Sequence, residues 1–100
     1  MNIEDKGETL AVDGIGELAA GNASLVRDEV RAALKDSHST ITVDLSDTSF
    51  LDSSGLGTLI SLHKTMMGRS GVVRLLNPTP VATQVLELTR MHRIFEIVRD

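Results

Sequence analysis

The stretch ITVDLSDTSFLDSSGLG, residues 41–57, decides the fold, because the hydrophobic period changes within it. In residues 41–46, Ile, Val and Leu alternate with Thr, Asp and Ser, which is typical of a strand with one buried face. From Ser54 onward the hydrophobic residues follow helical spacing. A strand that leads into a helix is the repeating unit of α/β domains, so this stretch predicts that class of fold.

The flanking segments repeat the alternation of strand and helix. Right-handed crossovers between consecutive strands make the later strands parallel. The polar face of residues 41–46 predicts helices packed mainly on one face of the sheet. We therefore expect a single α/β domain over residues 1–100 with a mixed sheet of four to five strands. After an initial strand or hairpin, the expected order is a strand at 9–15, a helix capped by Asn22 or Ser24, a strand at 41–46, a helix from Ser54 to Gly68, a strand at 72–76, a helix beginning at Pro80 and a strand at 94–98.

Hydrophobic spacing also predicts how the helix side chains are grouped. Of Phe50 and Leu51, just before the second helix, we expect one to be buried. The stripe expected on the second helix contains Leu56, Leu59, Ile60, His63, Met66 and Met67, with the two methionines filling the core. On the last helix, Val81, Val85 and Leu88 line one side, with Ala82 and Leu86 alongside.

The composition excludes several classes of function. The net charge is −4 and the ten basic residues are scattered, so nucleic acid is not an expected partner. The absence of cysteine excludes disulfides and thiolate chemistry, and the three separated histidines lack metal-ligand spacing. The acidic start is unlike a signal peptide and no apolar run is long enough for a membrane span. We expect a cytoplasmic protein without membrane insertion.

The segment from Asp52 to Gly57 carries the clearest functional signal. In parallel α/β sheets, ligand and partner sites lie at the carboxyl ends of strands, where this segment is expected. Ser53 or Ser54 is the expected N-cap of the second helix. Gly55 and Gly57 are expected to leave space around the serine oxygen, because neither has a Cβ atom.

A phosphate on Ser54 is expected to act mainly on a bound partner. The first-turn N–H groups and the helix dipole favour the dianion, whereas the neighbouring carboxylate of Asp52 opposes it. These local effects are of similar size, so the fold is expected to survive phosphorylation. A dianion buried in an interface without a cation is far more unfavourable. The residues alone also fit a plain helix cap and turn, and this second interpretation stays open.

A longer string makes the pattern more specific. Val43-Asp44-Leu45-Ser46, followed by Phe50-Leu51-Asp52-Ser53-Ser54-Gly55-Leu56-Gly57, resembles the signature of the STAS domain, in particular that of bacterial anti-sigma factor antagonists. Residues 16–18 look like the family's second strand and residues 26–30 like its first helix. Residues 77–81 and 86–89 look like its last helix, and residues 94–97 like its closing strand. The resemblance implies a STAS-type domain along nearly the whole chain.

The resemblance further implies a phosphorylation-controlled partner switch. In the family, the unphosphorylated antagonist binds an anti-sigma factor that is also a serine kinase of the histidine-kinase-like ATPase type. Phosphorylation by that kinase breaks the complex, and a metal-dependent serine phosphatase restores it. No catalytic residue, cofactor or metal is expected. The implied phosphorylation site is Ser54, with Ser53 as the fallback, and the implied partner-binding residues are Asp52, Ser53, Ser54, Gly55, Leu56 and Gly57.

Three departures from the family pattern bear on this expectation. Ala19 stands where the family often has an aspartate near the phosphorylation site, and Arg90 stands where a glycine often ends the last helix. The chain ends at Asp100, where many relatives add a helix, so we expect a sheet end or hydrophobic flank to face partners. The alternative function is a non-catalytic STAS subunit of an ABC lipid-transport complex or a sensory scaffold. An enzyme is disfavoured, because Ser53 has Leu51 rather than glycine two residues before it, unlike a nucleophile elbow.

Overall fold

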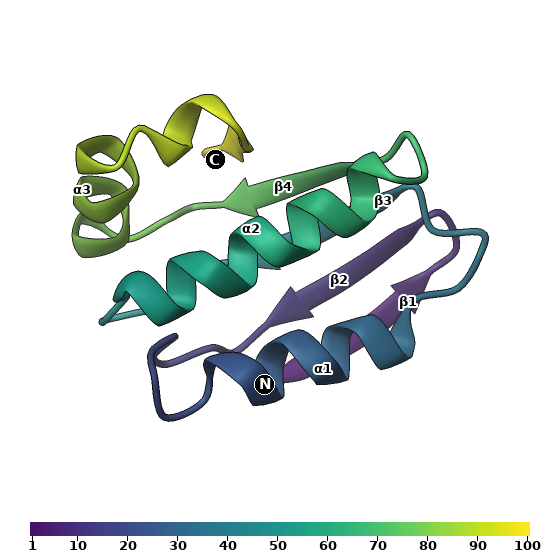
Figure 1. The fold of residues 1–100 in the computed structure, drawn as a ribbon, viewed down its shortest axis with the longest axis horizontal. Coiled ribbons are helices and arrows are strands. Elements are labelled where there is room, and N and C mark those ends of the chain that lie inside the picture. The colour runs from purple at the N-terminus through teal and green to yellow at the C-terminus, as the bar shows by residue number, and fades with distance from the viewer.

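One sheet of five strands, covered by helices, makes up the computed structural model, which describes residues 1–100. The strand order is β1-β2-β3-β4-β5; β1 is antiparallel to β2, and all other neighbours are parallel. Figure 1 shows α1 and α2 side by side across one face, with α3 at the end toward which β2 and β4 point. The predicted mixed sheet with helices mainly on one face is confirmed. The elements are β1 (Asn2–Lys6), β2 (Thr9–Asp13), α1 (Ala23–Ala33), β3 (Thr40–Asp44), α2 (Ser53–Met67), β4 (Val72–Leu76), α3 (Pro80–Leu88), the 3₁₀ helix η1 (Met91–Arg93) and β5 (Glu96–Val98).

The first two strands form a hairpin ahead of the α/β units. Their pairing covers both strands completely, and Gly7 in the turn has a φ of 82°. Strand β2 ends two residues earlier than expected, because Gly14 takes a φ of 71°, a left-handed conformation that breaks the extended backbone. Residues 16–18 do not form the strand that they resemble. They contribute only an isolated parallel bridge between Leu18 and Leu51.

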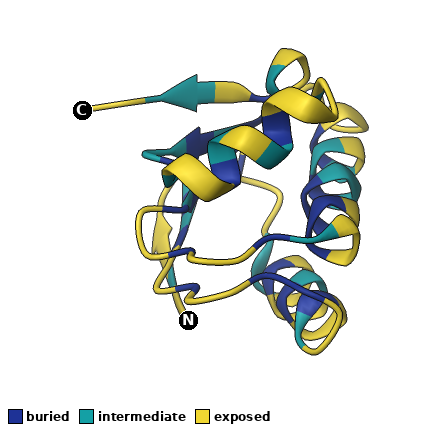
Figure 2. Cartoon of the chain, turned by 90° about the vertical axis from the view of Figure 1, so that its left-hand side faces the viewer, coloured by how far each residue is buried: buried dark blue, intermediate teal, exposed yellow.

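The core lies between the sheet and the helices (Figure 2). Along β3 the predicted alternation is confirmed: Ile41 and Val43 are buried, whereas Thr42 and Asp44 are partly exposed. The buried hydrophobic residues form one cluster that includes side chains from α1, α2, α3 and the sheet. A single core therefore holds the three helices against the sheet. No helix combines the length and the hydrophobicity needed to cross a bilayer.

Helix α2 buries a stripe that is rotated from the predicted one. Its buried hydrophobic residues are Leu56, Leu59, Leu62 and Met66. Met67 is 62% exposed, so the prediction that it fills the core is wrong. Each residue advances the helix by about 100°, and Leu62 continues the stripe between Leu59 and Met66. Met67, one residue further, points to solvent.

Helix α3 buries one side in the core and leaves hydrophobic residues of the other side exposed or half-buried. Ala82 and Leu86 are fully buried and supply its contact with the core. Val81 is 46% exposed, Leu88 is 77% exposed, and Val85 is half-buried. The side of the helix lined by these three residues is therefore available to other molecules.

A polar cluster closes the end of the sheet opposite to α3. The carboxylate of Asp5 accepts hydrogen bonds from Lys35 Nζ at 2.8 Å and from His38 Nε2 at 2.9 Å. His38 is buried, and its Nδ1 accepts the backbone N–H of Lys35 at 2.9 Å. The hydrogen bonds from Lys35 and His38, with a third from the Gly7 amide, hold the pKa of Asp5 well below its usual range. The cluster ties β1 to the loop that precedes β3.

Candidate functional site

The Asp52–Gly57 segment lies where three loops meet, at the carboxyl ends of the parallel strands (Figure 1). It ends the connection from β3 to α2. Thr48, buried in this connection, donates a hydrogen bond of 2.7 Å to the carbonyl of Ile15, in the loop that follows β2. Thr79, just before α3, donates one of 2.6 Å to the carbonyl of Thr48. These two hydrogen bonds join the three loops and hold the loops around the segment together.

The backbone of Leu18 holds the start of the segment. Its N–H donates to the carbonyl of Phe50 at 3.0 Å, and its carbonyl accepts from the N–H of Asp52 at 3.4 Å. Leu51, between them, is buried, whereas Phe50 is 51% exposed. The expectation that one of these two residues is buried is confirmed. The exposed ring of Phe50 stands beside the segment, two residues before Asp52.

Asp52, rather than a serine, caps helix α2. Its Oδ1 accepts the N–H of Gly55 at 2.9 Å, and its Oδ2 accepts the N–H of Ala20 at 3.1 Å. The prediction of Ser53 or Ser54 as the N-cap is wrong, because the helix already begins at Ser53 and a carboxylate can serve the helix and the adjacent loop at once. The backbone hydrogen bond from Gly55 is the main cause that lowers the pKa of Asp52, while burial opposes it and the bond from Ala20 adds to the lowering. Asp52 is thus an anion at neutral pH that links two loops.

Ser53 and Ser54 occupy the first two positions of α2, and both are exposed. Neither hydroxyl takes part in a hydrogen bond within the chain, in contrast to Ser49 and Thr58 on either side, whose hydroxyls bond to backbone carbonyls. The two serine hydroxyls are therefore free to meet another molecule.

The two glycines of the segment have different surroundings. A Cβ atom on Gly55 would clash with the carbonyl oxygen of Leu18 and lie 2.7 Å from Cδ1 of Leu51. A Cβ atom on Gly57 would have no atom within 4 Å. Gly55 thus permits a close approach of the Leu18 loop, a role that its place in the sequence did not predict. Gly55 and Leu56 are buried, whereas Gly57 and the two serines reach the surface.

Ala19 lies next to the Ala20 amide that Asp52 binds. Ala19 is buried, and its N–H donates to Oδ1 of Asn22 at 2.9 Å. Asn22 stands at the predicted N-cap position of α1, but its side chain bonds to this loop and not to the helix. Ala19 therefore brings only a methyl group to this loop, and the carboxylate of Asp52 joins the loop to the start of α2.

The site contains no arrangement of side chains suited to metal binding or nucleophilic catalysis. No three His, Cys, Asp or Glu side chains are grouped so that they could hold a metal ion. His63 packs edge-on against Phe95, with ring centroids 5.6 Å apart. His38 belongs to the Asp5 cluster, and His92 contacts the carbonyl of Leu86. No histidine is bonded to either serine of the segment.

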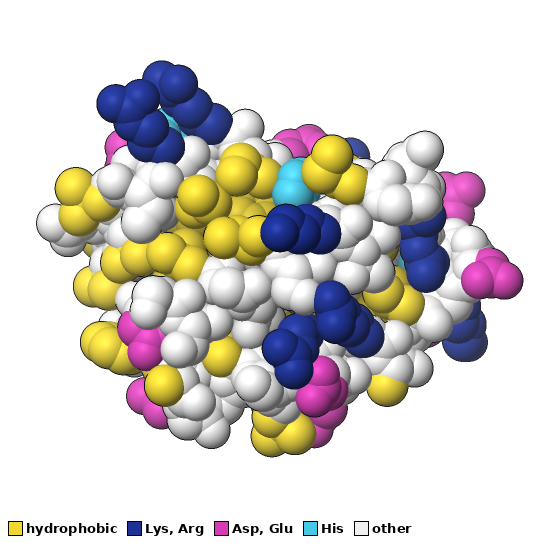
Figure 3. All heavy atoms as spheres, in the orientation of Figure 1, with side chains coloured by type: hydrophobic (Ala, Val, Ile, Leu, Met, Phe, Trp, Pro, Cys, Tyr) yellow, Lys and Arg dark blue, Asp and Glu magenta, His cyan; other side chains and the backbone are white.

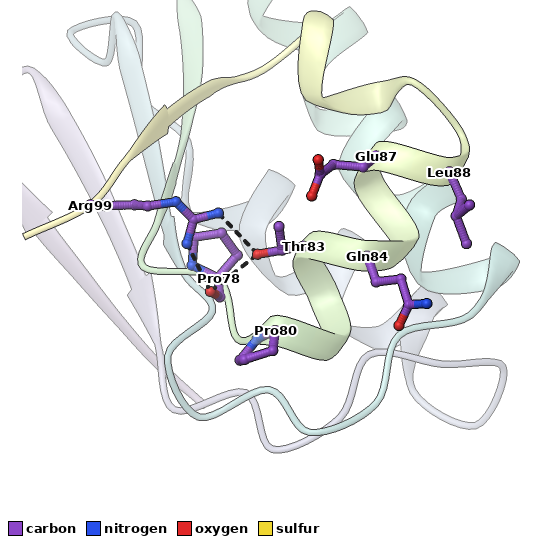
Figure 4. Close-up of a pocket in the computed structure, with 7 residues that line it drawn as sticks. All are labelled: Pro78, Pro80, Thr83, Gln84, Glu87, Leu88 and Arg99. Atoms are coloured by element: carbon purple, nitrogen blue, oxygen red, sulfur yellow. Dashed lines mark hydrogen bonds between the residues drawn. The ribbon is translucent and has the colours of Figure 1, made fainter.

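The largest hollow on the surface lies beside α3, away from the serines (Figure 4). Arg99 reaches across it and donates to the carbonyl of Pro78 at 3.2 Å and to Oγ1 of Thr83 at 3.0 Å. These bonds fasten the end of the chain to the start of α3. The hollow has a volume of about 540 Å³ and is lined by Pro78, Pro80, Thr83, Gln84, Glu87, Leu88 and Arg99.

Sequence reasoning missed Thr48 and the backbone amide of Ala20. Thr48 sits in a polar connection where the sequence offers several hydroxyls, so no local pattern marks it as buried. Asp52 was also a possible N-cap from the sequence, because aspartate is as good an N-cap as serine. The N-cap preferences of aspartate and serine are too similar to choose between Asp52 and Ser53 from the sequence.

This fold and this loop define the class of protein. The chain matches the STAS domain family over residues 1–100 and belongs to that family. The resemblance seen in the sequence is thereby confirmed. An anti-sigma F factor antagonist from Lysinibacillus sphaericus is 30% identical over 83 residues, which cover 82% of this chain and 71% of that protein.

Solved structures share the architecture. A putative anti-sigma factor antagonist from Thermotoga maritima superposes with a TM-score of 0.88 at 25% identity, over 99% of this chain and 85% of that one. The anti-sigma factor antagonist SpoIIAA in its unphosphorylated form gives 0.85 at 24% identity, over 99% of this chain and 86% of that one. The phosphorylated form of SpoIIAA from Bacillus gives 0.78 at 24% identity, over 99% and 89%. The five-stranded mixed sheet with its helices is therefore the STAS fold.

Proposed function

We propose that this STAS protein is an anti-sigma factor antagonist whose binding is controlled by phosphorylation of Ser54. The observation that carries the proposal is the exposed, unbonded hydroxyl of Ser54 at the start of a helix whose cap and supporting loops are ordered. The relative from Lysinibacillus sphaericus, an anti-sigma F factor antagonist, supports it. In this proposal the chain is a cytoplasmic binding protein and the substrate of a kinase, and it performs no catalysis.

The proposed partner is an anti-sigma factor that is also a serine kinase of the histidine-kinase-like ATPase type. It binds the unphosphorylated chain over the exposed part of the Asp52–Gly57 segment and then phosphorylates Ser54. A metal-dependent serine phosphatase removes the phosphate and restores binding. Ser54 is preferred over Ser53 because it directly precedes Gly55 in the family motif, and Ser53 is the second choice.

Charge, rather than refolding, is the proposed switch. A phosphate adds about −1.5 to −2 charges near neutral pH. The Asp52 carboxylate already accepts the Gly55 amide, so the helix N-terminus offers the phosphate less compensation than an uncapped helix would. The hydrogen bonds of Thr48 and Thr79 that join the loops do not involve Ser54, so the fold is expected to persist. The phosphate instead weakens binding, because a charge buried in the interface without an opposite charge destabilises the complex by about 2–5 kcal/mol. This corresponds to roughly a 30-fold or greater loss of affinity.

Mass spectrometry after incubation with ATP and each serine kinase of this type from the same genome tests the proposal. Phosphate on Ser54 is the expected result, and phosphate on neither serine with any kinase would overturn it. In calorimetric titrations, Ser54→Ala is expected to bind the kinase as wild type does, and Ser54→Glu roughly 30-fold more weakly. Ser70→Glu is the matched control and is expected to bind as wild type does, since it places the same charge on an exposed serine beyond the opposite end of α2. Equal affinities of Ser54→Ala and Ser54→Glu would contradict the charge mechanism.

A pull-down from the native organism separates this proposal from the alternative STAS function. Recovery of a serine kinase supports the antagonist. Recovery of an ABC transporter ATPase without any serine kinase would favour a structural subunit of a lipid-transport complex.

A further inference from the structure

The exposed side of α3 forms a hydrophobic surface. Val81, Val85 and Leu88 recur at helical spacing, and Leu88 is 77% exposed. Ile94, which is 41% exposed, follows shortly after the helix. These four residues are called the α3 patch below. Figure 3 shows hydrophobic side chains gathered over α3 and toward α2. Such gathered exposed hydrophobic surface is a mark of contact with another molecule.

Two unpaired arginines border the α3 patch. Arg90 and Arg93 follow the helix, are exposed, and belong to none of the salt bridges of the structure. Figure 3 shows basic side chains projecting from this corner of the molecule. Glu87, the acidic residue of α3, points toward Arg99 in Figure 4, whereas Leu88 points away from it. The patch thus has a positive border, although the chain carries a net charge of −4.

Arg90 holds a backbone conformation that glycine adopts without strain. Its φ is 60° and its ψ is 16°, in the left-handed region that a Cβ atom disfavours. The side chain has no salt bridge that would compensate for this strain within the fold. Left-handed backbone is common at the residue after a helix C-cap, so this conformation ends α3, and glycine would adopt it with less strain. The charged side chain itself is left without a partner inside the fold.

We propose that the α3 patch, with Arg90 and Arg93, binds an amphipathic helix of the partner protein that docks at Ser54. The inference rests on the proposed function, since it concerns the same partner. Hydrophobic residues of that helix lie along α3, because a stripe at i, i+4 and i+7 matches the ridges of another helix. Its Asp or Glu residues face the two arginines, because burying these cations needs opposite charge. An anionic membrane is the poorer occupant, since it repels a chain of net charge −4.

A single protein interface of ordinary size is wide enough to include both surfaces. Thr79, the N-cap of α3, is hydrogen-bonded to Thr48 in the loop that leads to Ser54, so α3 begins beside the loop of the proposed site. The molecule measures 32 × 26 × 24 Å. A protein interface of ordinary size buries about 800 Å² per partner, a disc roughly 30 Å across. An interface of this size that includes Ser54 is therefore wide enough to reach α3.

Calorimetric titration of the serine-kinase anti-sigma factor against variants of the full chain tests the inference. The double variant Arg90→Glu, Arg93→Glu is expected to bind at least about tenfold more weakly, and Leu88→Gln about fivefold more weakly. Met67→Gln is the matched control, because Met67 is an exposed hydrophobic residue of α2 outside the patch. Arg90→Gly is expected to weaken binding while raising the urea midpoint of unfolding, which separates the role in binding from any role in folding.

Each outcome decides for or against the inference. Wild-type affinity in the Arg90→Glu, Arg93→Glu variant, with weak binding by Ser54→Glu, would overturn the inference and leave the proposed function standing. No binding of the wild-type chain by any kinase of this type would overturn both. Sedimentation of the wild-type chain with anionic phospholipid vesicles, lost in the double variant, would assign the patch to a membrane and overturn the proposed occupant.

Discussion

Alanine substitutions at the two glycines of helix α2 are expected to change stability in opposite directions. Gly57→Ala adds a methyl group in open space on the helix, where alanine is favoured over glycine by about 1 kcal/mol. Gly55→Ala drives its Cβ into the carbonyl oxygen of Leu18 and toward Cδ1 of Leu51. The leucine side chain can rotate away, but the carbonyl belongs to a backbone that is itself hydrogen-bonded to Phe50 and Asp52. The cost is therefore expected near the upper end of the range for overpacking, about 2–3 kcal/mol.

The two variants are expected to differ by about 3 kcal/mol or more in the free energy of unfolding. For a domain of this size, 1 kcal/mol corresponds to about 4–8 °C in Tm, so Gly57→Ala melts a few degrees above wild type and Gly55→Ala well below it. Urea denaturation followed by circular dichroism measures both free energies under the same conditions. Equal stabilities for the two variants, or a gain in stability for Gly55→Ala, would refute the close approach of the Leu18 loop to α2.

Three further predictions concern the core, a buried hydroxyl and pH. Leu86→Ala is expected to lower the free energy of unfolding by about 2–5 kcal/mol and Leu88→Ala by less than about 0.5 kcal/mol; equal losses in urea denaturation would contradict the buried face assigned to α3. Thr48→Val leaves the carbonyl of Ile15 without its donor and is expected to lose about 1–3 kcal/mol in the same assay, and an unchanged midpoint would show that the loops are not joined there. Because the pKa of Asp5 is depressed in the folded state, its stabilising effect is complete above the unfolded value of about 4 and is lost as the pH falls below it. Urea midpoints between pH 2 and pH 6 are therefore expected to fall less steeply for Asp5→Asn than for wild type, and parallel curves would contradict the role of this cluster.

The sequence predicted strands and helices correctly where the spacing of hydrophobic residues fits only one type of secondary structure. Alternation in residues 41–46 predicted a strand with one buried face, and the change of period at Ser54 predicted the helix that follows. Both hold because the two periods depend only on the geometry of the backbone. Errors of one or two positions remained. Gly14 ends β2 early, and Met67 points to solvent, since spacing identifies a stripe but not its rotation against the sheet.

The family motif located the candidate site, but not its internal arrangement. Nothing local distinguishes Asp52 from Ser53 as the cap, because both are good N-caps. The second hydrogen bond of Asp52, to Ala20, spans 32 residues of sequence and exists only because the loops after β2 and β3 lie side by side. The close approach at Gly55 has the same origin.

By itself the sequence determined the α/β class, the family and the two serines at the start of α2, because periodicity and a contiguous motif are local properties of the chain. Only the tertiary structure decided which residues of that motif face outward, that Asp52 caps the helix, and that α3 turns Val81 and Leu88 to solvent. These features depend on contacts between segments that the order of strands in the sheet brings together. A pattern within one segment does not encode the rotation and distance of its neighbours.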